Sequence, residues 1–258
     1  MLEMNDIEQN KLMQALERME GIYDPEVKML REPFHTPGYH TTLKGGYVHL
    51  TRNSLTYAVA LLDSGIIANE TRAIDIINKI ISLQDINPEN KTYGIWSWYY
   101  EEPLEKMSPP DWNWADFCGK ELLQVVIDYE DRLPKDFMKK VRESILHASK
   151  SIRMRNMGPG YTNISIMGTY VTLVAGEHYN LPELFDYAKS RLFKLHEYST
   201  HHGAFTEYNS PTYTVVALED LSRMLNHVKN EECFLRIQDL NSIGWKCFAE
   251  HYHPSTRQ

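Results

Sequence analysis

The amino-acid sequence predicts an all-helical fold built from repeated pairs of helices. Apolar residues recur at helical spacing in segment after segment, and the alternating β-branched runs typical of strands are almost absent. The predicted helices cover residues 5–19, 54–67, 69–84, 113–130, 134–156, 162–177, 181–198, 211–228 and 231–250. Most of them form a hairpin with the next helix along the chain.

The hairpins recur at a regular interval. Their first helices begin near Ser54, Asn113, Thr162 and Pro211, which gives spacings of 113−54=59, 162−113=49 and 211−162=49 residues. A period of this size is typical of proteins built from stacked helical pairs.

The two helices of a pair differ in composition. Residues 162–176 and 211–218 carry no charged side chain, whereas residues 135–155 and 183–197 are charged on one face. A helix that is apolar all round is buried on all sides, and an amphipathic helix is covered on one side only. We therefore expect an inner and an outer layer, arranged as a complete or partial α/α toroid. A helical solenoid with a peptide-binding groove is the alternative.

Length and composition favour one domain spanning residues 1–258. With 42% hydrophobic residues, the chain is long enough to bury a sizeable core. No stretch approaches the roughly 18 consecutive apolar residues of a membrane helix. The first residues, MLEMNDIEQNK, are polar and acidic, unlike a secretion signal. We expect no membrane association and, by default, a cytoplasmic protein.

Charge and motifs exclude several classes of partner. A net charge of −8 argues against nucleic-acid binding, which needs a basic surface. Cys118, Cys233 and Cys247 are too few and too scattered for a disulfide framework or a cysteine-rich zinc site, so we expect them to be buried. The sequence contains no HExxH, Walker or Rossmann glycine pattern, so no metal or other cofactor is implied. It does not indicate an oligomeric state.

Aromatic residues concentrate in the loop before the helix at 113–130. Four of the five tryptophans, Trp96, Trp98, Trp112 and Trp114, lie between residues 93 and 114, where this loop leads into the helix, among three tyrosines. Flat apolar rings beside acids and amides are typical of sugar-binding sites, so these tryptophans are candidate substrate contacts. Packing of the loop onto the helices is the alternative for any one of them.

Acids and histidines lie close to the loops that lead into the inner helices. Asp111, Asp116 and Glu207 could supply the paired carboxylates of an inverting glycosidase. Asp111 could instead cap a helix, and Asp116 could be an ordinary polar helix residue. His202 and His253 are candidates for acid–base use or substrate contact, because adjacent histidines such as His201 and His202 rarely share a metal.

The segment HHGAFTEYNSPTYTVVALEDL resembles the heparinase II/III and alginate lyase families of polysaccharide lyases. These enzymes have a D-G-x-x-x-E-x-S-P-x-Y-H pattern that leads into an inner toroid helix. The matching residues are Gly203, Glu207, Ser210, Pro211 and Tyr213, with one more residue between Glu207 and Ser210 than the pattern has. The segment TNISIMGTYVTLVAGE resembles an earlier lyase stretch in which an Asn-His pair opens an inner helix, and Asn163 matches its Asn.

Two departures from the family pattern matter. Ile164 and Thr214 stand where the family has histidines. The lyases also usually continue into β-sandwich domains, and the chain ends at HYHPSTRQ without them. The resemblance therefore implies the N-terminal toroid part of a longer enzyme.

The resemblance also implies a cofactor-free chemistry, β-elimination at a uronate. That reaction needs the carboxylate neutralised, a base for the adjacent C–H, and an acid for the leaving oxygen. Asn163 would contact the carboxylate, and Tyr213 would act as base, acid or both. A phenol has a pKa of about 10, so nearby positive charge is required, and His202, Arg153 and Arg155 are candidates for it.

Each of these residues has a structural alternative. Tyr213 could be a core residue in the first turn of a buried helix. Asn163 could cap its helix, although Thr162 is the better cap and would leave Asn163 facing the cleft. Glu207 could bind a substrate hydroxyl or only orient its loop.

The sequence thus predicts a carbohydrate-active protein whose substrate is a uronate-containing polysaccharide or oligosaccharide cleaved by elimination. Two alternatives stay open. The first is a glycoside hydrolase on the same fold, using Asp111 or Asp116 with Glu207. The second is a non-catalytic helical-repeat domain that binds a glycan or a protein.

Overall fold

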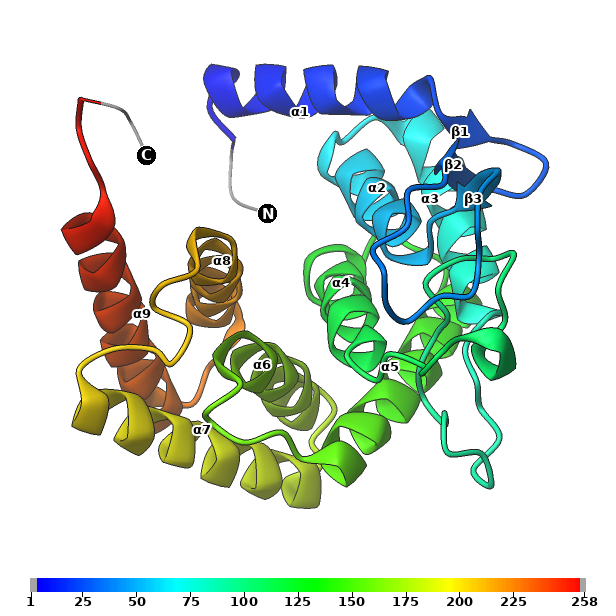
Figure 1. The fold of residues 1–258 in the computed structure, drawn as a ribbon. Coiled ribbons are helices and arrows are strands. Elements are labelled where there is room, and N and C mark those ends of the chain that lie inside the picture. The colour runs from blue at the N-terminus through cyan, green and yellow to red at the C-terminus, as the bar shows by residue number, and fades with distance from the viewer. Residues whose placement is uncertain (1–3, 256–258) are drawn as a thin grey trace. The chain divides into compact units, whose positions relative to one another are not determined.

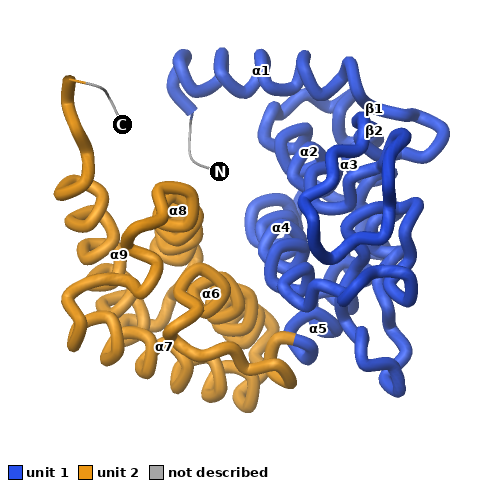
Figure 2. Tube along the Cα trace, in the orientation of Figure 1, with its two compact units in different colours: residues 1–151 blue, residues 152–258 orange. Residues whose placement is uncertain are grey.

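The computed structural model describes residues 4–255 (Figure 1). These residues contain nine α-helices, one 3₁₀ helix and three short strands. The prediction of an all-α fold is confirmed. The residues divide into two compact units, residues 1–151 (unit 1) and 152–258 (unit 2), and the boundary falls within one helix (Figure 2). The single toroid domain stays a prediction.

Unit 1 holds the N-terminal helices and a small sheet. Its elements are α1 (Asp6–Glu20), β1 (Tyr23–Asp24), β2 (Met29–Pro33), β3 (Tyr47–His49), α2 (Thr51–Asp63), α3 (Ile67–Ile81), the 3₁₀ helix η1 (Leu104–Lys106), α4 (Trp114–Tyr129) and most of α5 (Lys135–Arg155). Helix α2 is central, because it packs against α1, α3, α4 and β2.

The sheet was not predicted from the sequence. Its three strands are antiparallel in the order β1-β2-β3, with Tyr23 opposite Leu30 and Arg31 opposite His49. Strands of two to five residues are too short to show the alternation that identifies a strand in a sequence.

Unit 2 contains two helical hairpins. Helices α6 (Thr162–His178) and α7 (Pro182–His202) form the first, and α8 (Pro211–His227) and α9 (Glu231–His251) the second. Helix α6 packs on α8 and α7 packs on α9, which gives two layers within the unit.

The buried helix of unit 2 is α6. Every residue from Thr162 to Gly176 is buried, as its lack of charge predicts. Gly176 permits the close approach of α7, because a Cβ there would lie 2.8 Å from the backbone N and Cα of Phe185.

Two other predictions can be compared with the structure. All three cysteines are free and buried, as expected. No helix among the described residues is long and apolar enough to cross a membrane.

Candidate functional site

The two segments that carry the lyase resemblance meet at one end of unit 2. The loop between α7 and α8 reaches the first turn of α6, where the backbone N–H of Asn163 donates to Glu207 Oε2 across 2.8 Å. The N–H of Ser210 donates to the Glu207 carbonyl at 3.0 Å, and the N–H of Tyr213 donates to Ser210 Oγ at 3.3 Å. Hydrogen bonds through Glu207 and Ser210 therefore connect the starts of α6 and α8.

Tyr213 lies in the first turn of α8, and 46% of its surface is exposed. The alternative of a core tyrosine is therefore wrong. Pro211 occupies the start of the helix and Ser210 caps it, so the backbone that carries the phenol is well defined.

Asn163 is placed differently from its prediction. It is 2% exposed, and its Oδ1 accepts the N–H of Ile164 at 2.8 Å. Tyr161 occupies the N-cap position of α6 with no side-chain cap bond, so neither Thr162 nor Asn163 is the cap. The Glu207 carboxylate therefore accepts the backbone N–H of Asn163, so a side chain of the protein itself occupies this donor in the first turn of α6.

Glu207 has the environment expected of a functional carboxyl group. Burial raises its pKa above the usual value, and the hydrogen bond from the Asn163 N–H acts in the opposite direction. Carboxyl groups with a raised pKa are common among catalytic acids and bases.

The sequence did not reveal the positive charge beside this turn, which belongs to Arg191. This α7 residue is 6% exposed. Its guanidinium donates to Thr169 Oγ1 at 3.1 Å, to the Ile164 carbonyl at 3.3 Å and to Tyr187 Oη at 3.1 Å. All these acceptors are neutral, so the positive charge is not cancelled by an acid within this set of bonds.

The cations predicted from sequence each have contacts of their own in unit 2. His202 is the exposed last residue of α7, and its Nδ1 lies 2.8 Å from the carbonyl oxygen of Tyr198 in the same helix. Arg153 is 4.0 Å from a Glu183 carboxylate oxygen. Arg155 ends α5 and is partly exposed, and His253 is exposed beyond the end of α9.

Two of the four tryptophans predicted as candidate sugar contacts, Trp96 and Trp98, are buried, and the other two are partly exposed. Trp96 is fully buried and its Nε1 donates to the Ile80 carbonyl at 2.8 Å, so it has no ring face available to a ligand. Trp98 is 9% exposed and stacks on the partly exposed Trp114 with ring centroids 4.9 Å apart. Trp112 is partly exposed and donates to the Lys91 carbonyl at 2.9 Å.

Two acids of unit 1 that were predicted near the loops are buried. Asp111 is 6% exposed; its Oδ2 accepts the Trp98 Nε1–H at 3.2 Å and its Oδ1 accepts the Asn113 N–H at 3.0 Å. It therefore holds the turn that precedes α4 rather than facing a ligand. Asp116 is a buried residue of α4.

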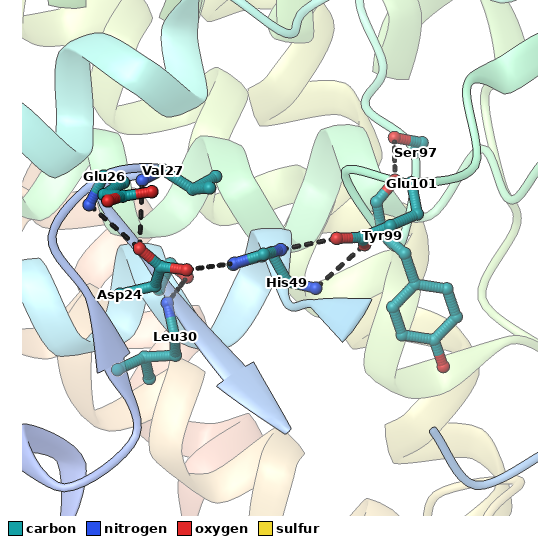
Figure 3. A network of polar contacts seen from close by, with 9 residues as sticks. Asp24, Glu26, Val27, Leu30, His49, Ser97, Tyr99 and Glu101 are labelled. Atoms are coloured by element: carbon teal, nitrogen blue, oxygen red, sulfur yellow. Dashed lines mark hydrogen bonds and ion pairs between the residues drawn. The ribbon is translucent and has the colours of Figure 1, made fainter. Parts of the chain in front are cut away.

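His49 forms a second polar cluster, which the sequence did not indicate (Figure 3). Its Nδ1 lies 2.5 Å from Glu101 Oε1 and its Nε2 lies 3.1 Å from Asp24 Oδ2. Both ring nitrogens of His49 are therefore paired with carboxylate oxygens. The His49 hydrogen bond is the main reason that the pKa of Asp24 is lowered. Among residues 4–255, no group of three or more His, Cys, Asp or Glu residues is placed to hold a metal ion.

Each unit also contains a pocket. In unit 1, the loop between α3 and α4 surrounds a pocket of about 820 Å³ that includes Tyr100 but none of the tryptophans. In unit 2, a smaller apolar pocket of about 140 Å³ lies between the start of α8 and the end of α9, and Pro211, Val215 and Phe248 line it.

Comparison with other proteins gives a family but no activity. No curated protein and no solved structure matches the chain. Residues 9–258 match a family model described as a domain of unknown function, DUF8769, and the chain therefore belongs to that family.

Proposed function

We propose that the chain is a carbohydrate-active enzyme of the polysaccharide lyase type, with its site at the start of α6 and α8. The observation that supports this most directly is the exposed Tyr213, connected through Ser210 and Glu207 to the first turn of α6. The arrangement of both units in one α/α toroid belongs to the same proposal.

In the proposed reaction the substrate is a uronate within a glycan chain. The Tyr213 phenolate takes the proton at C5, next to the carboxylate. The electrons of that C–H bond form a C4–C5 double bond, and the C4–O4 bond breaks. The resulting phenol then returns a proton to the leaving oxygen, so no cofactor or other reactant is consumed.

The substrate carboxylate would replace Glu207 at the first turn of α6. In that position the Asn163 N–H would donate to it, and the partial charge of the helix start would stabilise its negative charge. The Arg191 guanidinium, which bonds the Ile164 carbonyl, adds a permanent positive charge beside the same turn. Both effects favour the anionic transition state.

The test is the ultraviolet absorbance of the unsaturated uronate product, with alginate, heparan-type and other uronate polymers. We expect a rise with the wild type and at least about a hundredfold slower rise with Tyr213→Phe, because the phenyl ring cannot exchange a proton. Tyr47→Phe is the matched control, since Tyr47 is 56% exposed and lies in β3, not at the start of α6 or α8. Absence of a rise with every polymer, or an unchanged rise in Tyr213→Phe, would refute the proposal.

A hydrolase is the second candidate, because Glu207 alone could serve it as a general acid. Burial raises the pKa of Glu207, which favours the protonated form that donates to a leaving glycosidic oxygen. Hydrolysis would produce new reducing ends with no rise in ultraviolet absorbance, and Glu207→Gln would abolish them. The same incubations therefore separate the two activities.

A further inference from the structure

The loop between α3 and α4 is held in one conformation by hydrogen bonds and close packing. Asp85 accepts from Asn90 Nδ2 at 3.0 and 3.1 Å and from Thr92 Oγ1 at 2.6 Å. Gly94 has φ +83° and packs against α5, where a Cβ would lie 2.4 Å from the His147 carbonyl oxygen. The pocket that this loop surrounds is therefore formed before any ligand binds.

The lining of this pocket combines an aromatic ring, aliphatic surfaces and charged groups. Tyr100 is 43% exposed and faces the space together with Leu104 and Pro110. Glu89, Lys91 and Glu105 also line it. In the part of the chain that the structure describes, the side-chain charges of these three residues form no hydrogen bond or ion pair, so they are available to a ligand.

Tyr100 is a fixed platform. Its N–H donates to the His49 carbonyl at 3.1 Å, and the next residue, Glu101, is bonded to the His49 ring (Figure 3). The Lys79 ammonium lies 4.0 Å from the centroid of the Tyr100 ring. A ring held in this way loses little conformational freedom when a ligand stacks on it.

The charge of the lining limits the ligand. Asp85, Glu89 and Glu105 are acidic and Lys91 is basic, so the lining carries 1−3=−2 formal charges. A uronate would be repelled. A neutral sugar presents hydroxyl donors to free carboxylates and C–H faces to an aromatic ring, and both features are present here.

We propose that this pocket of unit 1 binds an uncharged oligosaccharide. Its volume of about 820 Å³ lies within the range usual for small-ligand sites. The site does not rest on the elimination reaction proposed for unit 2, and it uses none of the same residues. In this proposal unit 1 binds an uncharged glycan, whereas the site proposed in unit 2 binds a uronate.

The first test is isothermal titration calorimetry of the full chain with cellotriose, maltotriose, mannotriose and, as the acidic counterpart, trigalacturonate. We expect at least one neutral trisaccharide to bind and trigalacturonate to bind at least about tenfold more weakly. Tyr100→Ala should weaken neutral binding about tenfold through loss of the stacking surface, whereas Tyr252→Ala in unit 2 should leave it unchanged. Failure of all three neutral sugars to bind, equal binding of trigalacturonate, or unchanged binding in Tyr100→Ala would overturn the proposal.

A charge reversal gives a second test that does not depend on the folding of the Tyr100 variant. Glu89 and Glu105 are both exposed, so Glu89→Lys with Glu105→Lys should fold normally. The lining then changes from −2 to −2+4=+2 formal charges. We expect this variant, with its circular dichroism unchanged, to bind trigalacturonate at least about tenfold more tightly than the wild type does. No gain in a folded variant would show that the lining does not set the ligand charge.

Discussion

Glu207 occupies the first turn of α6 with its carboxylate 2.8 Å from the backbone nitrogen of Asn163. The contact spans 44 residues of sequence and joins the loop before α8 to a buried helix. Burial of this carboxylate raises its pKa, and the hydrogen bond from the Asn163 N–H only partly offsets that effect.

Glu207→Gln should therefore change how stability depends on pH. A raised pKa means that the folded protein favours the protonated form of Glu207. The contribution of Glu207 to the free energy of unfolding is therefore fully present at a pH below the usual glutamate pKa of about 4.5. It is lost as the pH rises through the pKa of Glu207 in the folded protein. Urea unfolding at a series of pH values should show the wild type losing stability relative to Glu207→Gln across that window. Glu17→Gln on the exposed face of α1 should show no such trend; an identical trend there would contradict the assignment.

His49→Ala should destabilise the protein by about 2 kcal/mol at neutral pH, because a buried ring that bonds two carboxylates is lost. The Asp24 part of this effect has the opposite pH dependence to that of Glu207. Since the pKa of Asp24 is lowered, its contribution is present above the usual value of about 3.8 and is lost as pH falls through the folded-state pKa. Denaturant unfolding measures both effects, and the exposed His35→Ala is the control. Equal losses in the two variants would mean that the network contributes nothing.

Gly176→Ala should cost about 1–3 kcal/mol, because the added methyl group would lie 2.8 Å from the Phe185 backbone and would push α6 and α7 apart. Gly158→Ala is the matched change, since a Cβ at Gly158 meets nothing within 4 Å. Thermal unfolding of the two variants provides the comparison. A Gly176 variant as stable as the wild type would indicate that the two helices can separate freely.

Trp96→Ala should lower stability by about 3–5 kcal/mol without any direct effect on sugar binding, because the ring is fully buried and bonded to the Ile80 carbonyl. Trp245→Ala removes a ring that is 51% exposed and should change stability by no more than about 0.5 kcal/mol. Urea unfolding monitored by circular dichroism measures both. If Trp96 contacted a sugar directly, Trp96→Ala would lose sugar binding while keeping the stability of the wild type.

The helices of unit 2 could be read from the sequence because their periodicity is strong. The helix predicted at 162–177 corresponds to α6, Thr162–His178, and the helix predicted at 211–228 corresponds to α8, Pro211–His227. The prediction of 181–198 stopped too early, because α7 continues through both histidines to His202 and ends at Gly203. Helix ends depend on single capping residues, which periodicity does not detect.

The candidate site was less predictable, because exposure depends on tertiary packing. Tyr213 and Trp96 are both aromatic residues near loops, yet one is 46% exposed and the other is fully buried. The His49 cluster joins residues 24, 49 and 101 through strands too short to recognise. The position of Arg191 under the first turn of α6 likewise follows from the packing of α6 on α7 and has no sequence motif.

Arg191 holds the first turn of α6 to α7 as well as placing a positive charge beside it. Its planar fork also reaches Thr169, Ile164 and Tyr187 at once, which a lysine ammonium on a single stem could not reproduce. Glu207 would compete with an incoming anion for this turn, because its carboxylate already accepts the Asn163 N–H.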